Sequence, residues 1–217
     1  MQEKECLVAK DITLSESNIA EAQYILGHCY FDSDGGLPQD KHAAVVWWMR
    51  AADLGHVESR YRLGLCYYYG HGLAEDKAQA VMYFRSAVES GHVGSQYRLA
   101  LCYYLGHGLS EDKAQAVIYF RMAAESHTGA QFWLGTCYYS GEGELPQDQE
   151  AAVSWLNRAA EGGNKEAQYK LGCSYYHGKD GVEKNYEISQ AWLSKSAAQN
   201  NSSAKERLEK WFLKSKS

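Results

Sequence analysis

The sequence repeats one pattern along most of its length. A leucine followed by Gly or Ala recurs at intervals of 37, 36, 35 and 37 residues, at Leu26, Leu63, Leu99, Leu134 and Leu171. Residues 61–90 and 97–126 are identical at 24 of 30 positions, which indicates a recent duplication of that unit. A period of about 20–50 residues is the sequence signature of proteins built from stacked structural repeats.

Each repeat predicts two helices. In the second repeat, residues 58–69 form the first helix, which ends at Gly70, a residue typical of helix C-termini. Asp76 then caps a second helix, with Gln79 three residues later to complete a capping box. The same N-cap recurs in the other repeats, at Asp40, Asp112, Asp148 and, approximately, Asn185. A pair of short helices cannot bury its apolar face alone, so the pattern predicts a stacked α-solenoid.

These rows resemble the Sel-one-like repeat family, a relative of the tetratricopeptide repeat. Repeat four carries the pattern most plainly, at Ala130, Leu134-Gly135, Tyr138, Gly141, Gly143, Asp148, Ala152, Trp155 and Ala159-Ala160. The resemblance implies an all-α, right-handed α-α superhelix of five helical hairpins. Their expected bounds are about 18–54, 55–91, 92–126, 127–163 and 164–201.

The two ends of the chain lie outside these repeats. Residues 202–217 predict a C-terminal capping helix, opened by a capping box of Ser203 and Glu206. Trp211 and Phe212 are expected to cover the apolar flank of repeat five. Residues 1–17 fit either an arm or a partial repeat.

Composition excludes several classes of function. The net charge of −5 argues against nucleic-acid binding, which needs a basic face. No apolar run reaches the roughly 18 residues of a membrane span. The N-terminus lacks the apolar core of a signal peptide, although a signal removed before residue 1 stays compatible with the sequence. A cytoplasmic or other reducing compartment is therefore expected.

Cysteine and histidine recur but do not predict a metal or cofactor site. Cys29, Cys66, Cys102 and Cys137 form one row, and helical phase places Cys66 on the core stripe. Neighbouring helices lie about 8–10 Å apart, beyond the roughly 7 Å between Cα atoms that a disulfide allows. Free buried thiols are therefore expected. His56, His92 and His127 follow the second helices, where imidazoles can satisfy the last carbonyls.

No catalytic constellation stands out. The one formal match is Ser202-x-x-Lys205, the spacing of penicillin-reacting serine enzymes, without their accompanying motifs. Because it lies where the terminal helix begins, capping explains it. The chain is predicted not to be an enzyme.

The first helices carry the best candidates for binding. Helical phase places aromatic and basic side chains opposite the core stripe, and in tetratricopeptide-like folds that edge lines a concave groove. Tyr61 and its equivalents are expected to pack between repeats. The predicted partner-binding residues are Arg62, Arg98, Trp133, Lys170, Tyr68, Tyr104, Tyr139 and Tyr176. Aromatic residues and Arg are the usual anchors of protein interfaces.

The resemblance implies an adaptor, since related proteins hold partners in degradation complexes, organelle assembly, bacterial signalling and host contact. The predicted function is a non-catalytic scaffold that binds a peptide or protein in the groove. The cations favour a partner with acidic side chains or a free C-terminal carboxylate. A bacterial inhibitor or immunity protein is the alternative within this class. A small-ligand or glycan receptor is the alternative from another class, because stacked Tyr and Trp suit sugar rings.

Overall fold

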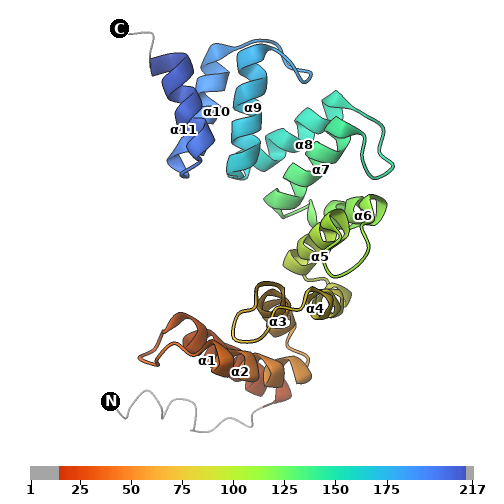
Figure 1. The fold of residues 1–217 in the computed structure, drawn as a ribbon, viewed down its shortest axis with the longest axis vertical. Coiled ribbons are helices and arrows are strands. Elements are labelled where there is room, and N and C mark those ends of the chain that lie inside the picture. The colour runs from red at the N-terminus through yellow and green to blue at the C-terminus, as the bar shows by residue number, and fades with distance from the viewer. Residues whose placement is uncertain (1–14, 214–217) are drawn as a thin grey trace. The chain divides into compact units, whose positions relative to one another are not determined.

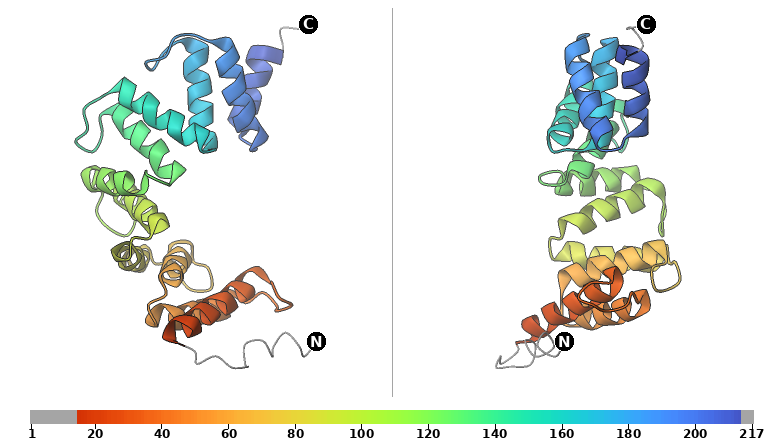
Figure 2. Two further views of the ribbon diagram at one scale, coloured as in Figure 1. Left: turned by 180° about the vertical axis from the view of Figure 1, so that it is seen from behind. Right: turned by 90° about the vertical axis from the view of Figure 1, so that its left-hand side faces the viewer.

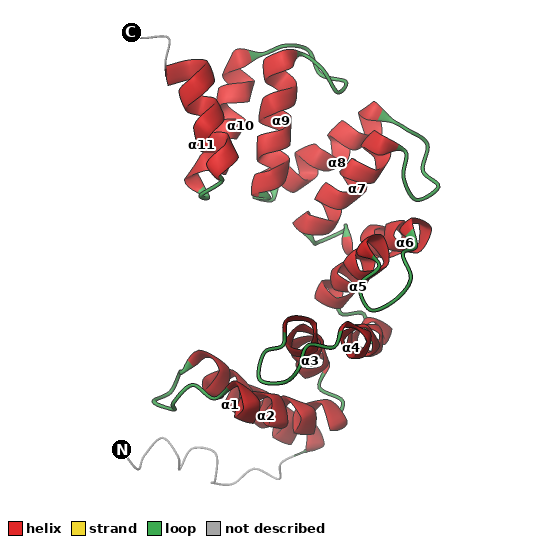
Figure 3. Ribbon diagram, in the orientation of Figure 1, coloured by secondary structure: helices red, strands yellow, loops and turns green. Residues whose placement is uncertain are grey.

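The structure is a computed structural model that describes the backbone of residues 15–213 and the side chains of residues 15–211. Within these residues the chain forms eleven α-helices and one π-helical segment, and no strand (Figure 3). The all-α prediction is therefore confirmed. The predicted arm, residues 1–17, falls mostly outside the described part of the chain, although its last two residues already belong to the first helix.

The chain divides into two compact units. The N-terminal unit runs to Cys102 and includes Gly106–Ser110, whereas the C-terminal unit contains Tyr103–Leu105 and the chain from Glu111 onward. The first holds α1 (Glu16–Asp32), α2 (Lys41–Asp53), α3 (Val57–Tyr69), α4 (Lys77–Glu89) and most of α5 (Val93–Leu105). The second holds α6 (Lys113–Ala123), α7 (Thr128–Ser140), α8 (Gln149–Glu161), α9 (Lys165–His177), α10 (Tyr186–Ala198), α11 (Ser202–Leu208) and the π-helical segment η2 (Glu209–Leu213).

Successive helices form hairpins. Figure 1 shows α1 beside α2 and α3 beside α4 in one unit, and α7 beside α8 and α9 beside α10 in the other. Both views of Figure 2 show the blue helices α9, α10 and α11 packed side by side. Four of the five expected hairpins and the C-terminal helix are therefore present.

Local capping defines the ends of these helices. Gly70 ends α3 in the left-handed conformation (φ 70°), and Gly106, Gly141 and Gly178 do the same for later first helices. The Asp76 side chain accepts a hydrogen bond from the Gln79 amide at 2.9 Å. Asp76 donates its own amide to the Tyr67 carbonyl at 2.8 Å. The predicted N-cap is thus confirmed, but the Asp76 amide is bonded to Tyr67 instead of the Gln79 side chain of the expected capping box.

The second glycine of the Gly-x-Gly turn lets one repeat touch the repeat before it. A Cβ at Gly72 would collide with the carbonyl group of Lys41, at the start of α2. A Cβ at Gly108 would collide with the Lys77 carbonyl in the same way. Gly72 also has a φ of +77°, which side chains rarely adopt. Glycine is therefore required here by both conformation and close approach.

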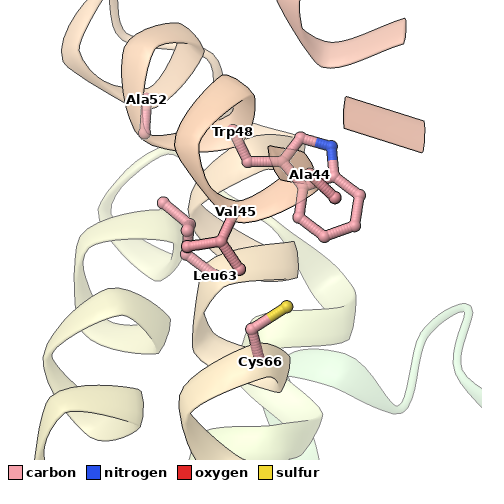
Figure 4. Packing of buried hydrophobic residues seen from close by; sticks show 6 residues of the cluster. All are labelled: Ala44, Val45, Trp48, Ala52, Leu63 and Cys66. Atoms are coloured by element: carbon pink, nitrogen blue, oxygen red, sulfur yellow. The ribbon is translucent and has the colours of Figure 1, made fainter. Parts of the chain in front are cut away.

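In the N-terminal unit the core runs between α1 and α2 and on to α3. Figure 4 shows Trp48 and Val45 of α2 close to Leu63 and Cys66 of α3. Trp48 lies so close to Gly27 that a Cβ there would be 2.5 Å from the indole. Its Nε1 donates a hydrogen bond to the Tyr24 carbonyl at 3.2 Å, which satisfies the one polar atom of this buried ring.

The cysteine row lies largely in this core, as predicted. Cys66, Cys102 and Cys137 are buried, whereas Cys29 and Cys173 are partly exposed; all five carry free thiols. Burial raises the pKa of Cys66, Cys102 and Cys137 to about 11. These thiols therefore stay protonated at neutral pH.

The C-terminal helix follows repeat five in the position of another first helix. Its N-cap is Asn201, whose side chain accepts from the Ala204 amide at 3.1 Å, so the predicted Ser203–Glu206 capping box is wrong. Asn201 and Leu208 each follow their counterparts in repeat five, Asn164 and Leu171, by 37 residues. Glu209 then stands where Gly172 follows Leu171.

Trp211 covers repeat five as predicted. Its ring stacks on Tyr176 of α9, with centroids 3.8 Å apart and planes inclined by 13°. The side chain of Phe212, the other predicted contact, lies outside the described residues.

Candidate functional site

Four of the predicted partner-binding residues each stand directly before a repeat leucine, and we call them the binding row. Arg62 of α3 and Arg98 of α5 belong to the N-terminal unit, and Trp133 of α7 and Lys170 of α9 to the C-terminal unit. All four side chains are partly buried. Each lies against an aromatic side chain from the first helix of the preceding repeat, within its own unit.

Arg62 is neutralised within its own helix. Its Nε donates to Oε1 of Glu58, one turn earlier, at 3.0 Å. The Tyr24 hydroxyl of α1 is a further hydrogen-bond partner. Burial works against the charged form, but Tyr24 and Glu58 outweigh it and raise the pKa of Arg62.

Arg98 carries an uncompensated charge. Its Nη1 donates to the Tyr69 hydroxyl at 2.9 Å, and the Tyr61 hydroxyl is a second partner. Its Nε is shielded from solvent and has no acceptor. Within residues 15–211 no carboxylate forms an ion pair with it. Burial opposes the charge of Arg98, while the two tyrosines raise its pKa.

Trp133 and Lys170 pack on tyrosines of the preceding repeat. The Trp133 ring lies 4.8 Å from the Tyr104 ring and nearly parallel to Phe120, at 6.0 Å. The Lys170 ammonium lies 4.4 Å from the centre of the Tyr139 ring, a cation–π contact. Burial lowers the pKa of Lys170, and the nearby Asp180 carboxylate opposes that shift.

The four predicted tyrosines hold the repeats together. The Tyr68 hydroxyl lies 2.5 Å from Nδ1 of His107. Tyr139 donates to Asp180 at 2.9 Å, and Tyr104 donates to Glu142 in the same manner. Each of these partners lies in the turn that follows the next first helix, and Tyr176 stacks on Trp211 instead. The structure thus gives these side chains contacts between repeats, and their role in partner binding stays a prediction.

The row has a further member that sequence reasoning missed. Arg207 of α11 follows Lys170 by 37 residues and precedes Leu208 by one. Its guanidinium lies 4.9 Å from the Trp211 ring, and its hydrogen bond to the Tyr169 hydroxyl raises its pKa. The unbroken 37-residue spacing from Leu171 to Leu208 was the signal that could have revealed it.

The histidines after the second helices cap the helices that follow, which corrects the expectation that they bind the carbonyls before them. Nδ1 of His56 accepts from the Ser59 amide at 3.2 Å, and Nδ1 of His92 accepts from the Ser95 amide at 3.0 Å. Nε2 of His92 also reaches Glu58 of the preceding repeat at 3.0 Å. In the described part of the chain, no group of three His, Cys, Asp or Glu side chains could hold a metal ion.

The Ser202-x-x-Lys205 spacing does not form a dyad in the structure. Ser202 is the exposed first residue of α11, and the Lys205 ammonium donates to the Asn200 side chain at 3.0 Å.

Among the helices that the structure describes, none combines the length and the apolar character that crossing a membrane requires.

Comparisons with known proteins identify the repeats. A family model described as Sel1 repeat matches residues 20–56, 57–92, 93–127, 128–164 and 165–201. The protective antigen c5321 of uropathogenic Escherichia coli, which displays an SLR fold, has a TM-score of 0.77 and 32% identity over 88% of this chain and 41% of that one. A Sel1 repeat protein from Oxalobacter formigenes has a TM-score of 0.75 and 30% identity over 88% and 55%. The chain thus spans about half the length of these two relatives.

A third solved structure is more distant. The immunity protein Pa5087 from Pseudomonas aeruginosa has a TM-score of 0.56 and 20% identity over 90% of this chain and 74% of that one. At this identity the likeness concerns the fold alone. The comparison with curated proteins finds no match.

Proposed function

The chain belongs to the Sel1 repeat family, and we propose that it is a non-catalytic scaffold. It binds another protein through the face of its first helices that carries the binding row. Proteins of this family are generally protein-interaction scaffolds. The resemblance assigns that face to a concave groove, and solenoids use such surfaces for binding.

One observation carries the proposal: the position before the repeat leucine holds a cation or an indole in every repeat after the first. Its occupants are Arg62, Arg98, Trp133, Lys170 and Arg207. On a chain of net charge −5, this row reverses the charge balance. Arg and Trp are enriched among the residues that contribute most to protein interfaces. The row therefore favours a partner segment with acidic side chains or a free C-terminus.

A single dedicated partner is the narrower form of this proposal. An inhibitor that masks one enzyme is such a case, and the immunity protein Pa5087 shares the fold. Such an inhibitor would bind one partner tightly through the same face. An adaptor would instead bind several partners or a short motif common to them.

A site-specific photo-crosslinking experiment tests the binding face. Tyr69 touches Arg98 and is 46% exposed, while Met82 of α4 is 62% exposed on a second helix and away from the row. A photoreactive residue at position 69 should crosslink the natural partner in a native lysate, and the same residue at position 82 should not. Crosslinks from position 82 alone would place the partner on the second helices and refute the proposal.

A further inference from the structure

The duplicated repeats differ at one place that concerns the binding row. Repeats two and three are nearly identical from residue 61 to 90 and from residue 97 to 126. Just before this stretch, repeat two has Glu58 and repeat three has Gly94 at the equivalent position. Each stands four residues before its row arginine, on the same helical face.

This difference leaves Arg98 without the carboxylate that its twin has. In α3 the Arg62 Nε donates to Glu58 at 3.0 Å. In α5 the Arg98 Nε has no acceptor, although it is shielded from solvent. A buried donor with no partner is costly, and more so on a charged group. Hydroxyl groups of Tyr61 and Tyr69 are the hydrogen-bond partners of the guanidinium, and neither supplies a negative charge.

We propose that Arg98 is the anchor of the row and that it receives a carboxylate of the partner protein in the place that Glu58 fills beside Arg62. The inference rests on the proposed function and names the partner chemistry at one residue. Arg62 is already paired, and Trp133 carries no charge. Lys170 has the Asp180 carboxylate near it, and Arg207 has that of Glu206. Of the row cations, Arg98 is the one whose electrostatic partners are tyrosines without a carboxylate. The partly buried setting strengthens such a charge-assisted bond.

The surroundings of Gly94 show that this place can take a carboxylate. A Cβ at Gly94 would lie 3.0 Å from Cε1 of His92 and 3.4 Å from Cζ of Tyr61. Both neighbours are side chains, so His92 and Tyr61 would have to shift by a few tenths of an ångström to accommodate the added atoms. A glutamate at position 94 would therefore supply from within the chain the group that the partner is proposed to supply from outside.

The first test needs no partner and measures the missing charge directly. Gly94→Glu and Gly94→Gln add side chains of the same size and differ only in charge. Gly94→Glu should have the higher melting temperature at low salt, and Arg98→Gln should remove most of that difference. If the two position-94 variants differ in melting temperature by the same amount with and without Arg98, the effect comes from the helix N-terminus alone. That result would contradict the proposal that Arg98 lacks a charged partner.

The second test uses peptides selected from a random display library on the full chain. One library presents free C-termini and the other is fused through its C-termini, so the two separate terminal from side-chain carboxylates. Gly94→Glu and Arg98→Gln should each weaken the selected peptide by at least about tenfold, and Gly94→Gln should leave its Kd nearly unchanged. Amidation of the peptide carboxylate should weaken binding to the wild type but not to Arg98→Gln.

The outcomes separate this inference from the proposed function. Peptides that lose affinity with Lys170→Ala and Trp133→Ala but ignore Gly94→Glu and Arg98→Gln would support the binding face and overturn the role of Arg98. Peptides that ignore all four variants, or a selection without any binder, would contradict both.

Discussion

Tyr104 of α5 donates its hydroxyl to the Glu142 carboxylate, 38 residues further along the chain, at 2.5 Å. The other oxygen of Glu142 accepts from the Lys113 ammonium at 2.8 Å. The Glu142 carboxylate, in the turn after α7, thus joins the end of α5 to the start of α6. Equivalent tyrosines reach the turns at His107 and Asp180, so this contact sets how successive repeats meet.

The Glu142 contact should make stability depend on pH. The hydrogen bonds from Lys113 and then Tyr104 lower the pKa of Glu142, while burial opposes this shift. A carboxyl with a lowered folded-state pKa adds stability above its unfolded value of about 4.3, and this gain is lost as pH falls through the folded-state pKa. Glu142→Gln should therefore melt below the wild type at neutral pH, with the gap closing in acid. Tyr104→Phe, which keeps the carboxylate and Lys113, should show a smaller gap; an identical gap at every pH would contradict the assignment.

Trp211 should stabilise the end of the stack. Removing this partly buried ring from Tyr176 by Trp211→Ala should cost about 1.5–3 kcal/mol and lower the melting temperature by several degrees. Lys210→Ala, at the exposed neighbouring position, serves as the control and should melt like the wild type. Thermal denaturation followed by circular dichroism measures both. Equal melting temperatures for the two variants would show that the ring does not dock.

Two glycines with the same backbone angle separate close approach from conformational strain. Gly72 and Gly91 both have a φ of +77°, but a Cβ at Gly72 collides with the Lys41 carbonyl and one at Gly91 meets nothing within 4 Å. Gly91→Ala should cost about 1–2 kcal/mol, the left-handed strain alone. Gly72→Ala should cost clearly more, because two repeats must move apart. Urea denaturation of both variants measures the difference, and equal losses would refute the contact between repeats.

The thiols should fall into two reactivity classes. Cys66, Cys102 and Cys137 are buried with a pKa of about 11, so very little thiolate forms at pH 8. Among the five thiols that the structure describes, Cys29 and Cys173 are partly exposed and should react first with Ellman's reagent in the native state. Mass spectrometry after brief labelling with an alkylating agent identifies the modified sites. Early labelling of the three buried positions would show that the core opens.

The row arginines should affect binding and stability together. Changing Arg62 and Arg98 together to Glu should weaken the affinity for a partner by more than about tenfold, or 1.4 kcal/mol. Helical phase alone predicts an unchanged fold, but the structure shows both side chains partly buried and bonded to tyrosines of the preceding repeat. A lower melting temperature is therefore expected as well, and Arg62→Gln with Arg98→Gln controls for the lost bonds. Wild-type affinity in the folded double Glu variant would exclude this face.

Short-range features of this chain were predictable from sequence, because they depend on neighbours along the helix. The Asp76 cap, the Gly70 terminus and the burial of Leu63 follow from local spacing. Contacts between repeats were not predictable in the same way. Whether Tyr68 faces a partner or bonds to His107 depends on which turn side chain comes within reach 39 residues later. Family patterns record the rows and omit such pairs.

The candidate site was predictable only in part. Spacing located Arg62 and Arg98, but it gave no sign that one is paired and the other is not, since that difference depends on Glu58 and Gly94. Arg207 was missed because the Sel-one-like repeat pattern ends with repeat five, although the spacing of 37 residues continues to Leu208.

Glu209 limits what can pack against the last described helix. In four of the five repeats a glycine stands at this position, and Gly172 of α9 lets Leu193 of α10 approach closely. The charged, exposed Glu209 side chain occupies the matching place at the start of η2, directly after α11. A helix from another copy would have to bury that carboxylate in order to continue the stack, which is strongly unfavourable. A second helix that packed on α11 as α10 packs on α9 would therefore meet a carboxylate where repeat five presents a glycine.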